Sequence, residues 1–418
     1  MPKEKKIGRN SGVGVGESAD ADGAAADAAP SVEELIVGPN SEATPVLSVV
    51  MPTMNEAAGI DTCFDWIETA VRKLGAPTEI LISDSSDDRT PEIARERGAI
   101  VVEPDEPGYG YAYRYAFERV RGEYVVMGDA DSTYDFSEIP RLLDQLEAQD
   151  ADIVMGSRLE GDIKPGAMPA LHRYVGNPLL TGFLNTFYDA GVSDAHSGFR
   201  VFHADVIEAI DLKSDGMEFA SEMVMKAGAE SLHIEEVPIT YHERAGEATL
   251  ESFRDGWRHV RFMLLNAPGY LFSIPGGVFS AVGILTLLLS LVGTQFSGVF
   301  FGIHTAIVGS LLTIVGFQVS GLAVFSAVTT DPIQAPTDTV TQLTRDRIRL
   351  EHGVLFGIIC AGSGGTYFAT VFTQWLAASS SVALAVVPNL IAFTAAVVGV
   401  QSVFSSFFLS MIAGDTCG

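Results

Sequence analysis

The sequence predicts an α/β domain built on a parallel, doubly wound sheet, followed by an α-helical domain that crosses a membrane four times. Short apolar runs alternate with amphipathic stretches between residues 45 and 246, which is the pattern of parallel strands joined by helices. Four long apolar stretches follow after residue 268. Each of them is at least as long as the roughly 20 residues that a bilayer-spanning helix needs.

The strand-like runs are, in chain order, VLSVVMP, TEILISD, AIVVEP, EYVVMGD and ADIVMGS. Amphipathic segments such as 61–74 and 91–97 lie between them and are expected to be helices. In doubly wound sheets, ligands bind at the carboxyl ends of the strands. Polar clusters occur at those ends, with TMNE after the first run, DSSDD after the second and DADST after the fourth. We therefore expect the functional site at this edge of the sheet.

Two segments flank the α/β domain. Residues 1–44 are rich in Ala, Asp, Gly and Ser and predict a disordered acidic tail, because this composition buries too little apolar surface to fold. No apolar core follows the basic start MPKEKK, so a signal peptide is not expected. Residues 247–268 carry apolar side chains at helical spacing beside three arginines, which indicates an amphipathic helix lying on a membrane surface. A helix packed on the core has the same period and is the alternative.

The membrane domain is expected over residues 269–418, with spans near 271–293, 302–328, 353–376 and 384–412. The spans contain no Asp, Glu, Lys or Arg, and the first and third connecting loops are uncharged. The second loop carries Arg345, Arg347 and Arg349, on the same side as the arginines before the first span. The positive-inside rule makes that side cytoplasmic, together with the α/β domain and both termini.

Charge restricts the partners. The chain holds 53 Asp and Glu residues against 26 Lys and Arg, a formal net charge of −27. We do not expect the protein to bind nucleic acid, because a protein that binds a phosphate backbone needs a basic face. Acidity spread over the whole domain, with few lysines, indicates a halophilic source in which salt screens the self-repulsion. The three cysteines have no paired spacing, so we expect neither disulfides nor a zinc site, and a reducing compartment.

Asp129 and Asp131, in GDADSTYDF, are the first candidates for chemistry. They stand one residue apart at the end of a predicted strand, where both carboxylates reach one side of a tight turn. Such oxygen ligands suit Mg²⁺ or Mn²⁺, which keep several waters and bind substrate phosphates through one or two carboxylates. An acidic turn in an acidic protein is the alternative.

The other strand ends offer weaker candidates. Asn55 and Glu56 could read a nucleobase or ribose, although Thr53 and Asn55 could instead form a turn and helix cap. Asp84 is the better ligand candidate in its cluster, because Asp88 or Thr90 could simply cap the next helix. The glycines of GYGYAY, including Gly110, permit close backbone approach to a ligand.

Arginines form a further group. Arg158, Arg173 and Arg200 could bind phosphate oxygens through their planar forks, or could pair with the plentiful acids. Arg244 lies just before the predicted surface helix, where a membrane-borne group would arrive. A nucleotide-binding P-loop motif and a serine nucleophile elbow are both absent from the sequence.

Five motifs, PTMNE, DSSDD, GDAD, GSR and SGFR, occur in that order across residues 52–200. Together with the four spans, this set resembles family 2 glycosyltransferases with the GT-A fold, and among them the polyprenyl-phosphate hexosyltransferases related to dolichyl-phosphate mannose synthase. Residues 241–260 are similar to the haloarchaeal dolichyl-phosphate glucosyltransferases that begin S-layer N-glycan assembly. The resemblance covers roughly residues 46–268, and the membrane part matches in architecture alone.

The resemblance implies a role for each matching residue. The donor nucleotide site would contain Pro52, Asn55, Glu56, Asp84, Gly110 and Asp129. A Mg²⁺ or Mn²⁺ ion would be held by Asp129, Asp131 and Thr133, the last at a position where relatives often have Gln. The acceptor phosphate would be bound by Arg158, Arg173 and Asn177. Arg244 would grip the donor diphosphate, although the AGEAT that follows departs from the G-x-S-K pattern of the family. The catalytic set is therefore expected to be Asp129, Asp131, Arg158, Arg173 and Arg244.

The implied activity is transfer of a hexose, glucose from UDP-glucose, to dolichyl phosphate at the cytoplasmic membrane face, with inversion, for protein N-glycosylation. A mannose synthase that uses GDP-mannose is the nearest alternative. A processive polysaccharide synthase is less favoured, because the Q-x-x-R-W motif of those relatives is absent. A non-catalytic flippase or scaffold is less favoured because no charged residue marks a path through the spans.

Overall fold

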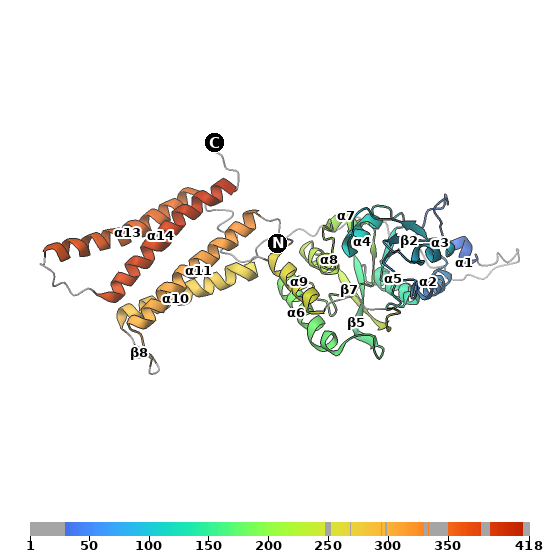
Figure 1. Cartoon of the computed structure of the whole chain (residues 1–418), viewed down its shortest axis with the longest axis horizontal. Helices are drawn as coiled ribbons and strands as arrows, with labels where there is room; N and C mark the ends of the chain where they lie inside the picture. The colour runs from blue at the N-terminus through green and yellow to red at the C-terminus, as the bar shows by residue number, and fades with distance from the viewer. Residues whose placement is uncertain are drawn as a thin grey trace.

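The structure, a computed structural model, describes residues 30–246, 252–267, 269–293, 295–296, 299–329, 333, 350–377 and 385–412. Residues 1–29 of the expected tail, residues 247–251 of the expected surface helix and the arginines at 345, 347 and 349 lie outside these ranges. The described chain forms an α/β domain followed by a group of long helices (Figure 1).

Seven strands form one sheet in the order β3-β2-β1-β4-β6-β5-β7. The strands are β1 Leu47–Thr53, β2 Thr78–Asp84, β3 Ile100–Val102, β4 Tyr124–Met127, β5 Ile153–Ile163, β6 Arg200–His203 and β7 Ile234–Tyr241. Neighbouring strands are parallel except where β6 pairs with β4 and β5. The predicted runs correspond to β1–β5, so the predicted α/β class with a mostly parallel sheet is confirmed.

The strands β6 and β7 were not predicted. β6 has only four residues and runs antiparallel between β4 and β5. β7 contains Glu235, Glu236 and Pro238, a composition that does not indicate a buried strand. It lies at the edge of the sheet, where the missing N–H of a proline leaves no ladder partner unpaired.

Helices cover both faces of the sheet (Figure 1). The helices of this domain are α1 Val32–Leu35, α2 Ile60–Leu74, α3 Thr90–Glu96, α4 Tyr109–Phe117, α5 Ile139–Ala148, α6 Asn177–Tyr188, α7 Asp205–Ile210 and α8 Phe219–Ala229, with short turns η1 Phe136–Glu138 and η2 His172–Gly176. Val49 and Val50 are neighbours on β1 and point to opposite faces. Val49 belongs to a core that includes Phe64 of α2, and Val50 to a core that includes Phe219 of α8. Each buried phenylalanine contributes roughly 1.5–3 kcal/mol to folding.

The start of the described chain corrects the expected tail. Residues 32–35 form α1, where the Ser31 N–H bonds the Glu34 carboxylate at 2.9 Å. Leu35 is buried in the core, and the Val37 N–H bonds the Thr78 carbonyl at 2.8 Å. The prediction of disorder up to residue 44 was therefore wrong for residues 30–44. The average composition of the tail concealed the short apolar run LIV, which packs beside β2.

The expected amphipathic helix is α9, Ser252–Leu265, in its described part. Met263 is buried in the core, and its carbonyl accepts a bond from the Tyr188 hydroxyl at 3.2 Å. Trp257 is 62 % exposed, and Arg258 and Arg261 are also exposed. One face of α9 thus packs on the α/β domain, and another presents an aromatic side chain and two cations to the outside. The core-packed reading is therefore confirmed for this face, and the membrane-surface role of the exposed face stays a prediction.

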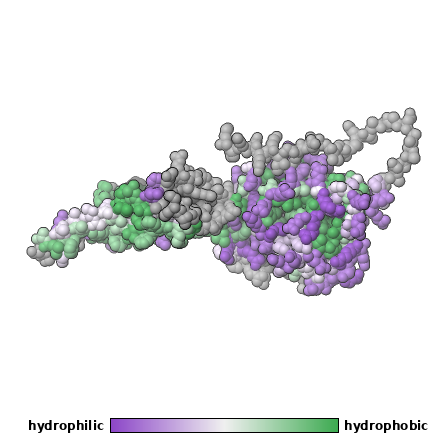
Figure 2. All heavy atoms as spheres, turned by 90° about the horizontal axis from the view of Figure 1, so that it is seen from above, coloured by the Kyte–Doolittle hydropathy of each residue, from purple (hydrophilic) through white to green (hydrophobic). Residues whose placement is uncertain are grey.

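Four helices are long and apolar enough to cross a membrane, over Leu271–Val292, Ile303–Ser326, Glu351–Ala377 and Val386–Ile412. They belong to α10 Ile274–Val292, α11 Ile303–Thr329, α13 Leu350–Ala377 and α14 Val386–Ile412, with a helical turn η3 Gly269–Ser273 before α10 and a short strand pair, β8 Gln295–Phe296 and β9 Val299–Phe300, before α11. The predicted fold class with four apolar helices is confirmed. Hydrophobic residues cover this region, whereas hydrophilic residues dominate the α/β domain (Figure 2).

The membrane helices form two hairpins, α10–α11 and α13–α14, with small residues at the contacts. A Cβ added to Gly283 would lie 2.5 Å from Thr313 N, and one added to Gly357 would lie 2.6 Å from Gly399 O. Small residues let apolar helices approach closely in a bilayer, where packing rather than the hydrophobic effect holds helices together. A hydrogen bond of 2.6 Å between Ser310 Oγ and Thr394 Oγ1 links α11 to α14.

Candidate active site

The three polar clusters meet because β1 lies between β2 and β4, parallel to both. Thr53 at the end of β1 pairs in register with Asp84 at the end of β2, and Met127 ends β4 just before Asp129. This carboxyl edge, formed by the ends of β1, β2 and β4, is where the strand pattern predicted a site.

The loops after β1 and β2 hold each other through side chains. The Thr53 hydroxyl donates to Asp84 Oδ1 at 2.6 Å, and the Asp87 N–H donates to Asn55 Oδ1 at 2.9 Å. Asn55 has a positive φ of 63°, and α2 begins only at Ile60. The alternative in which Thr53 and Asn55 cap that helix is therefore wrong. In the next loop, Asp88 Oδ1 accepts the Thr90 N–H at 2.9 Å, but the N-cap of α3 is Arg89, which makes no side-chain cap bond, so neither Asp88 nor Thr90 caps this helix.

Asp129 is held from α4. Its Oδ1 accepts a hydrogen bond of 2.8 Å from the Tyr109 hydroxyl. Its Oδ2 lies close to Gly198, where an added Cβ would come within 3.2 Å. Burial, reinforced by the neighbouring Asp131 charge, raises the pKa of Asp129 above its ordinary range. Burial and the Asp129 charge also raise the pKa of Tyr109, so the tyrosine is protonated and serves as the donor.

Asp131 has different partners. Its Oδ1 accepts from the Thr133 hydroxyl at 2.6 Å and from the Thr133 N–H at 3.1 Å, across a turn in which Ser132 has a positive φ of 62°. Its Oδ2 lies 3.4 Å from Arg244 Nη1. The Thr133 hydroxyl thus orients Asp131 through Oδ1, and the other carboxylate oxygen, Oδ2, faces the Arg244 guanidinium.

The segment after β7 brings Arg244 to the aspartates. The His242 N–H bonds the Thr133 carbonyl at 2.9 Å, and the Ala245 N–H bonds the Asp131 carbonyl at 3.1 Å. These two bonds fix the backbone on either side of Arg244 against the DADST loop. The Arg244 guanidinium then spans Asp131 and Glu56, with its Nη2 2.5 Å from Glu56 Oε1.

Glu56 is a perturbed acid in this cluster. Burial raises its pKa from 4.5 to about 7, the Arg244 cation opposes the rise, and the charges of Asp131 and Asp129 add to it. Perturbed carboxyls gather where a protein prepares a charged site for a ligand. Two of these carboxylates, Glu56 and Asp131, share the single guanidinium of Arg244, and Asp129 adds a further acidic group nearby.

We expect the stability of the ligand-free protein to fall as pH rises from about 4.5 to about 7, in part because of Glu56. Folded Glu56 holds its proton more tightly than the unfolded chain does, so the unfolded state binds fewer protons across this window. Glu56→Gln should flatten the fall of stability with pH. Part of the fall should remain, because the pKa of Asp129 is also raised. Thermal midpoints of the full chain across the window measure the slope, with exposed Glu243→Gln as the control. Equal slopes in the two variants would contradict the assignment.

Arg158 forms a buried ion pair with Asp194. Its Nε and Nη2 donate to the two carboxylate oxygens of Asp194 at 2.7 and 2.8 Å, and both side chains are buried. Burial alone would raise the pKa of Asp194, but the Arg158 charge and hydrogen bonds lower it. The guanidinium carbon also lies 5.3 Å from the centre of the Tyr241 ring. The fork predicted to bind a phosphate is thus occupied by an acid, the reading that the sequence left open.

Arg173 and Asn177 lie on another segment, in η2 and at the start of α6. The Arg173 guanidinium lies 5.4 Å from the centre of the Tyr174 ring, and the Asn177 amide contacts Met168 Sδ at 3.5 Å. In the described part of the chain, no hydrogen bond or ion pair joins either residue to Arg158. Their acceptor-binding role stays a prediction.

Three further predicted positions have structural partners. Gly110 is buried at the start of α4, where an added Cβ would lie 2.8 Å from Phe219 Cβ. Arg200 is fully buried and donates to the carbonyls of Ser197, Ala195 and Ala220, so it holds a loop together. Pro52 pairs in register with Ser83, one position before the strand ends.

Sequence reasoning missed three residues of this site. Tyr109 stands inside GYGYAY, a stretch chosen for its glycines rather than its tyrosines. Asp194 was one acid among many, and nothing in the local sequence ties it to Arg158. Gly198 lies in the quoted SGFR motif, but its closeness to Asp129 arises only when β6 inserts beside β4.

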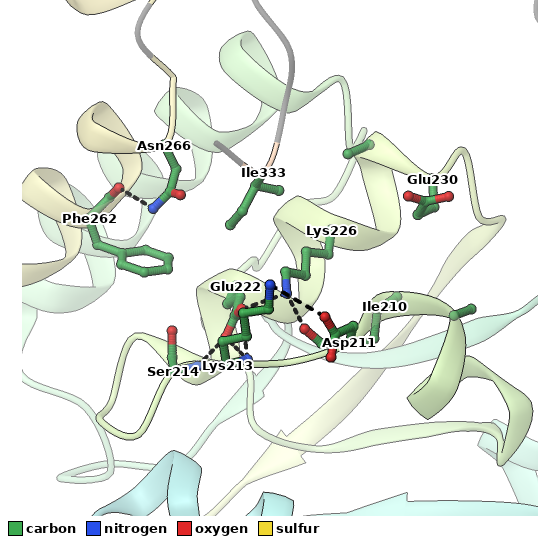
Figure 3. Close-up of a pocket in the computed structure, with 12 residues that line it drawn as sticks. Ile210, Asp211, Lys213, Ser214, Glu222, Lys226, Glu230, Phe262, Asn266 and Ile333 are labelled. Atoms are coloured by element: carbon green, nitrogen blue, oxygen red, sulfur yellow. Dashed lines mark hydrogen bonds and ion pairs between the residues drawn. The ribbon is translucent and has the colours of Figure 1, made fainter. Parts of the chain in front are cut away.

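A cavity of about 430 Å³ lies apart from these residues, between α7, α8 and α9 (Figure 3). Two ion pairs line it, with Lys226 Nζ 2.9 Å from Glu222 and Lys213 Nζ 3.4 Å from Asp211. Glu222 also accepts the backbone N–H groups of Lys213 and Ser214. The cavity wall thereby fixes the loop at residues 213–215, whose Asp215 carbonyl accepts the Gly110 N–H of α4.

Comparison with known proteins identifies two family regions in the chain. The family described as Glycosyl transferase family 2 matches residues 48–211, and the Glycosyltransferase family 2 C-terminal transmembrane region matches residues 326–413. The second match and the four apolar helices indicate a membrane protein.

Three curated relatives are informative. The low-salt glycan biosynthesis hexosyltransferase Agl6 of Haloferax volcanii is 54 % identical over 388 residues, covering 93 % of this chain and 94 % of that protein. The dolichyl-phosphate hexose transferase of the same organism is 34 % identical, covering 50 % of this chain and 89 % of that protein. The dolichol-phosphate mannosyltransferase of Pyrococcus furiosus is 27 % identical, covering 59 % and 73 %.

Among solved structures, glucosyl-3-phosphoglycerate synthase from Mycobacterium tuberculosis, in complex with Mn²⁺, UDP-glucose and glycerol 3-phosphate, aligns with a TM-score of 0.42 and 21 % identity. The alignment covers 53 % of this chain and 79 % of that one. The predicted resemblance to dolichyl-phosphate hexosyltransferases is confirmed by the curated relatives. Identity of 54 % over nearly the whole of both chains, together with the matched family regions, shows that the chain belongs to glycosyltransferase family 2 and is a glycosyltransferase.

Proposed function

We propose that the protein transfers glucose from UDP-glucose to dolichyl phosphate, with inversion at the anomeric carbon, at the cytoplasmic face of the membrane. The observation that carries this proposal is the meeting of Asp129, Asp131 and Arg244 at the carboxyl edge. Arg244 belongs to the segment that leads toward α9, so the same stretch of chain connects the charged cluster with the exposed face of that helix. The names of the curated relatives support hexose transfer to a dolichyl phosphate.

A divalent cation, Mg²⁺ or Mn²⁺, fits the aspartates. Asp131 Oδ2 already faces a positive group, the Arg244 guanidinium at 3.4 Å, and carboxylate oxygens are the ligands that both ions prefer. The described residues contain no group of three or more metal-binding side chains here, so the donor phosphates and water would complete the shell. When bound, the ion would supply charge neutralisation for the leaving diphosphate. Thr133 would orient Asp131 through the hydrogen of its hydroxyl, and the lone pairs of the same oxygen would be available to the ion.

The residues of the chain act by positioning and charge. Arg244 would turn from Glu56 and Asp131 toward the diphosphate, whose bond to the anomeric carbon breaks as the bond from the acceptor phosphate oxygen forms. An anionic phosphate oxygen is already a nucleophile, so no strong general base is required. Asn55, Glu56 and Asp84 would contact the nucleotide from the loops after β1 and β2. Arg158, Arg173 and Asn177 are proposed for the acceptor side, with Arg158 limited to its nitrogen that does not bind Asp194.

The proposed setting is the cytoplasmic membrane surface of a halophilic archaeon, with the lipid product used for N-glycosylation of S-layer protein. The exposed Trp257, Arg258 and Arg261 of α9 suit the headgroup region, where aromatic rings and cations are favoured. A lipid-borne phosphate travels at that same height.

The test uses the purified full-length protein in detergent and molar KCl. Radiolabelled UDP-glucose, dolichyl phosphate and Mg²⁺ or Mn²⁺ should give metal-dependent label in the lipid phase. No label from any donor would overturn the transferase proposal for this acceptor. Label from GDP-mannose in place of UDP-glucose would retain the reaction class and overturn the sugar assignment.

A further inference from the structure

We infer that Tyr109 is a positioning residue that fixes the carboxylate of Asp129 for the metal–nucleotide complex. The inference rests on the proposed function, because it names a residue that prepares the proposed donor site. It arises from the contact between Tyr109 and Asp129 at the carboxyl edge, and neither the sequence motifs nor the family match gives Tyr109 a role.

The contact is short and protected. The Tyr109 hydroxyl donates to Asp129 Oδ1 at 2.8 Å, from a residue 20 positions earlier in the chain. Hydrogen bonds to ionised acceptors are roughly twice as strong as those between neutral groups. The other oxygen, Oδ2, lies against the bare backbone of Gly198, within 3.2 Å of where a Cβ would stand. Oδ1 of Asp129 is therefore bound by Tyr109, and Oδ2 has space beside it because residue 198 has no side chain.

The hydroxyl is held in place by the way α4 is anchored. The Gly110 N–H donates to the Asp215 carbonyl at 2.9 Å, and side chains at that position are excluded by Phe219 and Ser214. Backbone groups of this receiving loop are in turn bound by Glu222, as seen in Figure 3. The first turn of α4 is thus fixed by the backbone, so Tyr109 does not depend on its own bond to Asp129 for its position.

A second tyrosine, Tyr113, lies one turn later on α4 and binds the loop that contains Asp129. The Tyr113 hydroxyl donates to the Gly128 carbonyl at 3.0 Å, and its ring lies 5.2 Å from that of Tyr109, edge to face. Residues four apart share one helix face. This face of α4 therefore binds both the backbone before Asp129 and the carboxylate itself, which sets the backbone and the side-chain torsion of one proposed metal ligand.

Tyr109→Phe removes only the hydroxyl. Groups that orient a metal ligand change metal affinity by about 10- to 100-fold when they are removed. We expect the Kd of Mn²⁺·UDP to rise by about 10-fold or more, and the KM for the sugar nucleotide to rise with it, whereas the KM for dolichyl phosphate should not change.

The matched control is Tyr111→Phe on the same helix. The Tyr111 hydroxyl donates to Asp105 at 2.5 Å in an exposed position away from the aspartates. Both variants lose one tyrosine hydroxyl bound to an aspartate, so the difference between them reports on Asp129. Gly198→Ala would place a Cβ 3.2 Å from Asp129 Oδ2 and 3.5 Å from the Tyr109 hydroxyl, so it should disturb the same contact and weaken Mn²⁺·UDP binding as Tyr109→Phe does.

Titration calorimetry with UDP and Mn²⁺ on the full-length protein in molar KCl gives the Kd, and thermal midpoints report folding. A purely structural role would lower the fraction of binding-competent protein and leave the Kd unchanged, which would overturn the inference. Equal Kd values for Tyr109→Phe and Tyr111→Phe would also overturn it. If Tyr109→Phe does not fold, an unchanged Kd in Gly198→Ala would be the overturning result. Failure of the unaltered protein to bind Mn²⁺·UDP would instead reject the UDP donor site on which the inference rests.

Discussion

Asp131→Asn is expected to lower hexose transfer by about 1,000-fold, the scale of losing one electrostatic contact to the charge that develops during reaction. Asparagine keeps the shape of the side chain and an oxygen that can accept from the Thr133 hydroxyl and N–H. It removes the negative charge that faces Arg244 at 3.4 Å and that would hold the cation. The fold should survive while the proposed diphosphate site loses one of its two carboxylates.

Initial rates of label entering the lipid phase measure this loss. Asp144→Asn on the exposed side of α5 removes one acid from the same domain and should leave the rate unchanged. Because both variants change the net charge equally, a difference between them cannot come from the overall charge of this acidic chain. Comparable rates in Asp131→Asn and the unaltered protein would contradict the metal assignment.

Asp194→Ala is expected to lower the free energy of unfolding by about 3–5 kcal/mol, the cost of leaving a buried charge without its partner. Arg158 is 7 % exposed and Asp194 is 0 % exposed, and two side-chain hydrogen bonds join them. The Arg158 backbone N–H also donates to Asp194 Oδ2 at 3.0 Å, so the variant loses a backbone partner too. Chemical denaturation of the full-length protein, followed by the fluorescence of its tryptophans, measures the change.

Asp162→Asn provides the comparison for this ion pair. Asp162 lies 2.5 Å from Lys164 on the surface, where its side chain is 66 % exposed. Exposed pairs contribute about 0–1 kcal/mol, so this variant should be nearly neutral. Similar losses in Asp194→Ala and Asp162→Asn would mean that burial does not govern the Arg158–Asp194 pair.

A double variant separates the two roles of Arg158. Arg158→Met with Asp194→Leu removes both charges and should recover much of the lost stability, since apolar pairs often replace buried ion pairs without loss. Transfer activity should stay low if the remaining nitrogen of Arg158 meets the acceptor phosphate. Full activity in a stable double variant would reduce Arg158 to a structural residue.

Much of the fold was predictable because its patterns are local. A buried parallel strand is a continuous apolar run, and a spanning helix is a longer one, so β1–β5 and the four apolar helices could be predicted from the position and length of the apolar runs. The carboxyl edge followed from topology, because parallel strands end on the same side. The strands β6 and β7 and the segment at residues 30–44 escaped prediction. They are short or polar, and their place in the sheet depends on partners far away in the sequence.

The candidate site divides in the same way. The sequence by itself determined which residues could carry charge at the strand ends, namely Asp129, Asp131 and the arginines, and it determined the family through the order of the motifs. Only the tertiary structure decided the pairing: Tyr109 binds Asp129, Asp194 occupies Arg158, and Arg244 reaches Glu56 across 188 residues of chain. Hydrophobic periodicity is a property of neighbouring residues, whereas the partner of a polar side chain depends on which segments the folded sheet brings together.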